Sequence, residues 1–202
     1  RHAIVRRLAA VESLGAATVI CTDKTGTLTR NEIRVQEVAL EGLRGAPGSL
    51  PAHDGRVRRF VEVAVLCNDS RAVSGGYLGD PTEVALLMAA ADLGADAEEM
   101  RLRLPRGDEF AFDSRRKRMS TIHDAAGRRL AAVKGAPEVL VGRCSAVEGP
   151  DGPAPFEAGR REAVLAEATR LAAGGLRTLA LAYREMDGMP ADADAVESHL
   201  TL

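Results

Sequence analysis

Residues 17–29 read Ala-Thr-Val-Ile-Cys-Thr-Asp-Lys-Thr-Gly-Thr-Leu-Thr. The apolar, β-branched run over 17–22 predicts a short strand. Asp23 follows where that strand would end, directly before a glycine-containing turn. In open α/β sheets, ligands and reacting groups collect at the carboxyl ends of strands. A carboxylate in this position can attack phosphorus and carry the phosphoryl group as an acyl phosphate.

The composition predicts a soluble globular protein and excludes several function classes. The chain has 202 residues, of which 46% are hydrophobic and 28% charged, and its net charge is −2. A nucleic-acid-binding domain would show a strong basic excess, so nucleic acid is not an expected partner. The longest apolar run, over 84–91, is far shorter than the ~20 residues that span a bilayer. The chain opens with Arg1 and shows no signal peptide, which suggests a piece of a longer protein.

The cysteines and histidines predict neither a disulfide framework nor a zinc site. Cys21, Cys67 and Cys144 are widely spaced, and we expect all three to be buried, reduced thiols. The four histidines are scattered, without the Cys/His spacing that binds zinc.

Hydrophobic spacing and capping residues predict the order of the helices and strands. We expect a short helix or turn over 4–15 and helices over 57–68, 80–93, 137–143 and 157–173. Expected strands cover 17–22, 110–112, 119–123, 129–134 and 176–184. Residues 42–55, 70–79 and 149–155 are rich in glycine, proline and serine, and we expect loops there. The clearest signal is at Asp80-Pro81, since an aspartate followed by proline is typical of a helix N-terminus.

The string DKTGTLT over 23–29 resembles the phosphorylation signature of the P-type cation-transporting ATPases. Four further segments resemble motifs of that family in type and in order. They are Gly79–Leu86 (GDPTEVAL, most similar to the calcium-type branch), Phe112–Ser120 (FDSRRKRMS), Val133–Glu138 (VKGAPE) and Gly175–Ala182 (GLRTLALA). Each alone is a modest signal, but their common order behind DKTGTLT makes the resemblance specific, and it covers nearly the whole chain.

The resemblance implies roles for residues of the DKTGTLT loop. Asp23 would be the nucleophile that accepts the γ-phosphate of ATP, and Lys24 would place positive charge beside the anionic transition state. Thr25 stands where related phosphatases have a second aspartate that acts as general acid and base. A threonine cannot do so, which implies a long-lived aspartyl phosphate. Asp23 and the carbonyl of Thr25 would also ligate Mg²⁺, although two oxygens do not make a complete octahedral site.

The other motifs imply an ATP-binding surface. Its expected residues are Glu83, Phe112, Ser114, Arg115, Lys117, Lys134, Gly135 and Arg177. Phe112 would stack on the adenine ring. The family's arginine after this aromatic corresponds to Ser114 here, with Arg115 adjacent, so which arginine reaches the phosphates is open. Lys134 precedes a proline-initiated helix whose N-terminus would also face an anion.

Each of these residues also has a purely structural interpretation. Glu83 fits equally well as the glutamate of a capping box begun by Asp80. Phe112 is consistent with ordinary core packing, and the basic stretch 115–118 with a solvated face. Lys134 is consistent with an exposed strand-to-helix turn, and Arg177 alone with a surface cation.

We therefore expect an α/β fold in which helices flank a mostly antiparallel twisted sheet. An incomplete haloacid-dehalogenase-like remnant would precede this sheet. The expected domains are 1–34, the first part of the phosphorylation domain, then 35–190, the nucleotide-binding domain, and 191–202, a return segment. The family implies that the rest of the pump, including its membrane helices, actuator domain and remaining phosphorylation domain, is the partner. It also implies a place at the cytoplasmic face of the cell membrane. This chain should bind ATP without turnover.

Two other functions remain open at this stage. One is a haloacid-dehalogenase-type phosphatase, which Thr25 and the lack of a downstream acidic motif oppose. The other is an interaction module that has lost nucleotide binding, which Phe112, Lys134 and Arg177 oppose. We also expect the run 17–22 to be poorly ordered or to pair with another copy, because a strand cut from its sheet has unpaired edges.

Overall fold

A computed structural model describes residues 15–19, 21–23, 32–125, 127–188 and 192–202. The chain divides into two compact units, Arg1–Glu32 and Ile33–Leu202.

In the first unit, the described residues are few and do not form the expected strand. Of the run 17–22, residues 17–19, 21 and 22 are described, and none of them belongs to a strand. Cys21 is exposed, so its expected burial is wrong, because no strand pairing covers it in the described part of this unit. Whether the run pairs with another copy stays a prediction. The short helix or turn expected over 4–15 lies almost wholly outside the described residues, as do Lys24 and Thr25.

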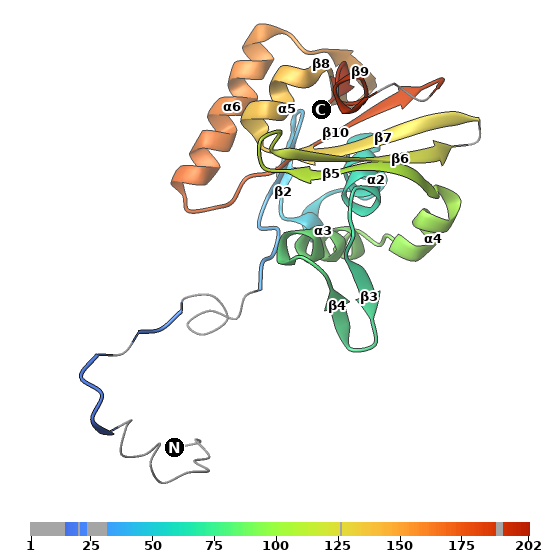
Figure 1. The fold of residues 1–202 in the computed structure, drawn as a ribbon. Helices are drawn as coiled ribbons and strands as arrows, with labels where there is room; N and C mark the ends of the chain where they lie inside the picture. The colour runs from blue at the N-terminus through green and yellow to red at the C-terminus, as the bar shows by residue number, and fades with distance from the viewer. Residues whose placement is uncertain (1–14, 20, 24–31, 126, 189–191) are drawn as a thin grey trace. The chain divides into compact units, whose positions relative to one another are not determined.

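The second unit is built on a seven-stranded sheet (Figure 1). In spatial order its strands are β5 (Arg106–Asp113), β6 (Arg118–Ala125), β7 (Arg128–Gly135), β10 (Ala180–Met186), β11 (Leu200–Thr201), β8 (Cys144–Gly149) and β9 (Gly152–Pro155). Every neighbouring pair is antiparallel except β11 with β8, which is parallel. The expected mostly antiparallel sheet is confirmed.

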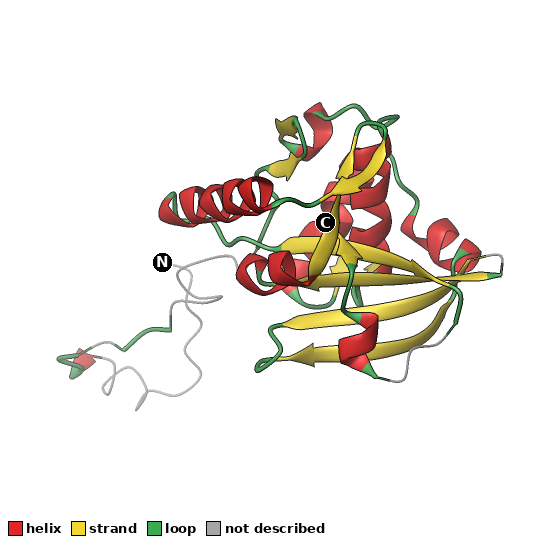
Figure 2. Cartoon of the chain, turned by 90° about the horizontal axis from the view of Figure 1, so that it is seen from above, coloured by secondary structure: helices red, strands yellow, loops and turns green. Residues whose placement is uncertain are grey.

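Helices cover both faces of this sheet (Figure 2). One face, called face A here, carries α2 (Gly55–Leu66), α3 (Pro81–Asp92) and α4 (Ala97–Arg103). The opposite face, face B, carries α5 (Pro137–Arg143), α6 (Ala158–Ala173) and the short α7 (Ala193–Val196). On face A, Leu66 and Cys67 pack on Met119 and Leu130; on face B, Leu140 packs on Val133 and Ala182.

Local capping explains why the predicted helices form where they do. The Asp80 side chain accepts hydrogen bonds from the backbone N–H groups of Thr82 and Glu83, and Pro81 is the first helical residue of α3. Pro137 likewise opens α5, and α6 ends at Gly174. The β6–β7 hairpin is also confirmed.

The structure corrects the prediction at the short elements. Two hairpins, β1 (Val38–Leu40) with β2 (Leu43–Gly45) and β3 (Arg71–Val73) with β4 (Gly76–Leu78), lie wholly or partly where loops were expected. The 3-10 helix η1 (Pro47–Ser49), helix α4 and strand β9 were also missed, and β10 begins at Ala180 rather than at Leu176. Strands of three or four residues are too short to show an alternating pattern.

The C-terminal residues belong to the same sheet, since β11 lies between β10 and β8. The domain boundaries at residues 34 and 190 stay predictions. Among the described residues, no helix has the length and apolar character needed to cross a bilayer.

The cysteines give a direct test of this fold. Burial raises the pKa of the Cys67 thiol to about 11 and that of Cys144 to about 12, so neither forms the reactive thiolate at neutral pH. We expect a thiol reagent to modify exposed Cys21 rapidly in the native chain and Cys67 and Cys144 only after unfolding. The Cys21→Ser variant should lose the fast phase. Fast native-state labelling of either of the other two, located by mass spectrometry, would contradict the fold.

Candidate functional site

A buried ion pair between Lys134 and Glu83 forms the centre of the candidate site. Lys134 lies on β7, between Met119 of β6 and Leu181 of β10, so its strand has neighbours on both sides. The side chains of Lys134 and Glu83 are only 10% and 12% exposed. An ammonium group buried without a partner would be strongly destabilising, so the carboxylate from α3 is what allows a lysine in this position.

The second carboxylate oxygen of Glu83 is held by the segment that precedes the β3–β4 hairpin. Glu83 Oε2 accepts hydrogen bonds from the backbone N–H groups of Asp69 (3.0 Å) and Ser70 (3.1 Å) and from Ser70 Oγ (3.3 Å). Within the described residues, these groups take the place of the Asp80 N–H that a capping box would use. Only half of the expected capping box forms, because Asp80 caps the Glu83 N–H while the Glu83 carboxylate binds tertiary partners.

Gly79 makes this arrangement possible. Its φ is +146°, and a Cβ at this position would lie 1.9 Å from Ser70 Oγ. Any side chain would displace the serine that holds Glu83. Gly79 belongs to the GDPTEVAL motif of the sequence, but Asp69 and Ser70, which orient Glu83, lie outside every motif.

Arg177 reaches the same region from the segment before β10. Its Nη1 donates to Thr82 Oγ1 at 3.1 Å, one residue before Glu83 in the first turn of α3. The structure thus brings Lys134, Glu83 and Arg177 together around the start of one helix, although they are far apart in the sequence.

Phe112 is 62% exposed, so it is not the core residue of the structural interpretation. Phe110 pairs with Ser120 and Asp113 pairs with Arg118, so β5 carries one extra residue in this interval. Such a bulge shifts the alternation of side chains. Phe110 packs into the core of face B, and the shifted register puts Phe112 on the opposite face, the one that carries Lys134.

The turn between β5 and β6 carries the other predicted residues. Asp113 Oδ1 accepts from the backbone N–H groups of Arg115 and Arg116, each at 2.8 Å, and Lys117 takes a positive φ of 53°. The hydrogen bonds from Arg116 and then Arg115 lower the pKa of the Asp113 carboxyl. Within the described part of the chain, the exposed side chains of Ser114 and Arg115 form no hydrogen bond or ion pair.

Lys117 pairs with Glu138 at the start of α5, with Nζ 3.2 Å from Oε1. The Glu138 backbone N–H, and next Lys117, lower the pKa of the Glu138 carboxyl. Both side chains are more than half exposed, so the pair is readily exchanged for another partner.

Gly135 serves packing in this structure. A Cβ on it would lie 2.7 Å from Arg118 Cβ, Leu140 Cδ1 and the Lys117 carbonyl oxygen. The close approach of β7, α5 and the β5–β6 turn therefore requires glycine, whereas the sequence suggested close approach of a ligand.

Asp23 belongs to the first unit, and its placement relative to the Lys134 site is not determined. The predicted metal ligand Thr25 lies outside the described residues. Among the residues that are described, no group of three histidine, cysteine, aspartate or glutamate side chains could hold a metal ion.

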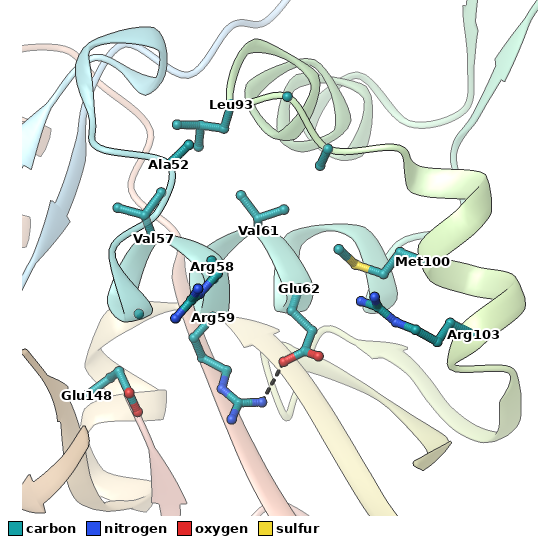
Figure 3. A pocket seen from close by; sticks show the side chains of 13 residues that line it. Ala52, Val57, Arg58, Arg59, Val61, Glu62, Leu93, Met100, Arg103 and Glu148 are labelled. Carbon is teal, nitrogen blue, oxygen red and sulfur yellow. Dashed lines mark hydrogen bonds and ion pairs between the residues drawn. The ribbon is translucent and has the colours of Figure 1, made fainter. Parts of the chain in front are cut away.

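A separate cavity of about 560 Å³ opens on the outer side of α2 (Figure 3). Its walls include Val61, Leu93 and Met100, and Arg59 and Glu62 form an ion pair in it. Neither Lys134 nor Glu83 lines it. The Lys134 site and this cavity are therefore separate features of the second unit.

Comparison with known sequences identifies the family. Residues 56–202 match the family described as P-type ATPase, cytoplasmic domain N. The chain belongs to the P-type cation-transporting ATPases.

Several bacterial ATPases of this family are similar to the chain. It is 41% identical over 185 residues to calcium-transporting ATPase 1 of Lactococcus lactis, covering 91% of the chain and 21% of that protein. It is 46% identical over 150 residues to the calcium-transporting ATPase lmo0841 of Listeria monocytogenes, covering 73% of the chain and 17% of that protein. The calcium-transporting ATPase of Bacillus subtilis is 36% identical over 224 residues, covering 100% of the chain and 25% of that protein. The chain thus spans about a fifth of the length of these P-type ATPases.

Two glycines near the site provide a matched test of the packing. We expect Gly135→Ala to lower the free energy of unfolding by about 1–3 kcal/mol, because its Cβ would overlap three neighbours. Gly142→Ala is the control. It lies in α5 with open space around its Cβ, so it should raise stability by about 0.5–1 kcal/mol. Urea unfolding measures both. Equal effects would show that the close approach at Gly135 is absent.

Proposed function

We propose that this chain is the ATP-binding region of a P-type cation pump, with the phosphorylation loop attached, at the cytoplasmic face of the membrane. The observation that carries the proposal is the Lys134–Glu83 pair at the start of α3, with exposed Phe112 on the same face of the sheet. Membership of the P-type cation-transporting ATPases supports it. Calcium is the favoured ion, because the similar proteins include calcium-transporting ATPases.

The proposed binding mode follows from the chemistry of the side chains. The Phe112 ring offers an exposed aromatic face for the adenine base, and such stacking contributes about 1–3 kcal/mol. Lys134 and Glu83 supply a donor and an acceptor for the polar edge of the base. Arg177, Lys117, Ser114 and Arg115 would contact the phosphates, with Arg115 favoured among the turn residues because no other group of the described chain holds its side chain. Gly135 supports the site by bringing β7 close to the turn.

In the whole pump, the bound nucleotide would be brought to Asp23. A carboxylate oxygen of Asp23 would form a bond to the γ-phosphorus while the bond from that phosphorus to the β–γ bridging oxygen breaks, leaving ADP. Lys24 and the hydroxyl of Thr25 would stabilise the charge on the transferring group. Mg²⁺, for which Asp23 and Thr25 are the predicted ligands here, would supply electrostatic stabilisation when bound. The chain alone should bind ATP without turnover, with Kd about 0.1–1 mM.

A calorimetric titration of the 202-residue chain with ATP tests the proposal. We expect saturable binding that weakens about tenfold in Phe112→Ala, because the stacking surface is lost. Leu102→Ala is the matched control, since Leu102 is an exposed apolar side chain (83%) on α4, outside the site. It should bind ATP as the parent chain does.

Two results would favour the alternatives. Binding that is absent, or insensitive to Phe112→Ala, would favour an interaction module without a nucleotide. Mg²⁺-dependent hydrolysis of phosphate monoesters that disappears in Asp23→Asn would favour a haloacid-dehalogenase-type phosphatase.

A further inference from the structure

A fully buried carboxylate lies on face B, behind the β5–β6 turn. The side chain of Glu197 is 0% exposed. Its Oε1 accepts from Arg116 Nη1 (2.5 Å) and Ser120 Oγ (2.9 Å), and its Oε2 accepts from Arg118 Nε (2.5 Å). We call these four residues the Glu197 cluster.

The cluster divides the basic stretch of the turn into two sets. Residues 115–118 are four consecutive cations, which would repel one another if they pointed the same way. The two even-numbered arginines turn inward to Glu197, whereas exposed Arg115 and Lys117 stay on the outside. The outward pair are residues that we assign to the phosphates.

The inward arginines also hold the backbone of the turn. Arg116 Nη2 donates to the carbonyl oxygen of Ala111 (2.7 Å), the residue before Phe112. Arg118 Nη1 donates to the carbonyl oxygen of Arg116 (3.0 Å). Both ends of the turn are thus connected to one carboxylate through guanidinium groups, which are planar and rigid donors.

Glu197 comes from the C-terminal segment, about 80 residues after the turn. It follows α7, whose first turn is capped by Asp192, and precedes β11. Asp194 of the same helix also pairs with Arg118 Nη2 (3.0 Å) and with Arg143 of α5 (2.9 Å). Residues 192–202 are therefore fastened to the rear of the turn that carries the proposed phosphate contacts.

We propose that Glu197 is a positioning residue for ATP: it sets the conformation of the turn 113–118 and with it the placement of Phe112 and the outward cations. The inference rests on the proposed ATP-binding function. Because linkage is reciprocal, nucleotide at the turn is also felt by residues 192–202. The chain thereby connects the front of the nucleotide site to its own C-terminal segment through one buried carboxylate.

The test is an ATP titration of the ¹⁵N-labelled 202-residue chain followed by NMR, with three variants. Glu197→Gln keeps the size of the side chain and removes its charge. Val196→Ala is the stability control, because Val196 is fully buried in the same short helix but forms no part of the cluster. Asp194→Asn removes the exposed carboxylate that also pairs with Arg118 but leaves the bonds of Glu197 in place, so it separates the buried carboxylate from this weaker, solvent-exposed pair. All are compared at a temperature where each is folded.

We expect Glu197→Gln to raise the Kd for ATP about tenfold, because the turn residues would no longer be oriented toward the phosphates. The ATP-induced chemical-shift changes of the Ser114–Lys117 amides should change as well. Val196→Ala and Asp194→Asn should stay within about twofold of the parent chain, since a loss of global stability alone does not move a turn. If Glu197→Gln binds ATP as Val196→Ala does, the positioning role is overturned while the ATP-binding function stands. If the parent chain does not bind ATP, the proposed function fails and the inference with it.

A second variant keeps the test decisive if Glu197→Gln does not fold. Arg116→Gln leaves Glu197 bonded to Arg118 and Ser120 but releases the Ala111 carbonyl. It should also raise the Kd about tenfold. Unchanged affinity in this variant would overturn the proposal.

Discussion

The buried ion pair between Lys134 and Glu83 is the interaction on which the candidate site depends. A lysine on a central strand is tolerated only with a carboxylate beside it, which fixes α3 against β7. The same carboxylate accepts the backbone N–H groups of Asp69 and Ser70, which brings the start of the β3–β4 hairpin to the helix. Gly79 is required because a side chain there would displace Ser70. Three parts of the chain are thus joined by one pair of charges.

Residues on both faces of the sheet shape this site. Face A carries Lys134 and, because of the bulge in β5, Phe112. Face B carries buried Glu197, which binds the arginines that point away from the site. The β5–β6 turn lies between the two, and the absence of a side chain at Gly135 lets it approach α5 closely. A strand turn that would otherwise be a flexible, highly charged loop is therefore held from face B, by Glu197 and by Glu138 of α5.

Local sequence signals predicted the elements that local interactions determine. Helix α3 with its Asp80 cap, the β6–β7 hairpin and the proline-initiated α5 could be read from the sequence, because cap, turn and periodicity lie within a few residues of each other. The partners of Glu83 and Glu197 could not. Glu197 meets Arg118 across 79 residues, and a single charged residue in the C-terminal segment gives no periodic signal of that contact. The two hairpins with three-residue strands were not predicted for a related reason, since their strands are shorter than the alternating patterns that indicate a strand.

The most direct test of the account is an experimental structure of the chain with a non-hydrolysable ATP analogue. We expect the adenine ring against Phe112, beside Lys134 and Glu83, with the phosphates directed toward Arg177 and the β5–β6 turn. An analogue bound in the cavity on the outer side of α2, without contact to Phe112 or Lys134, would contradict the proposed ATP site.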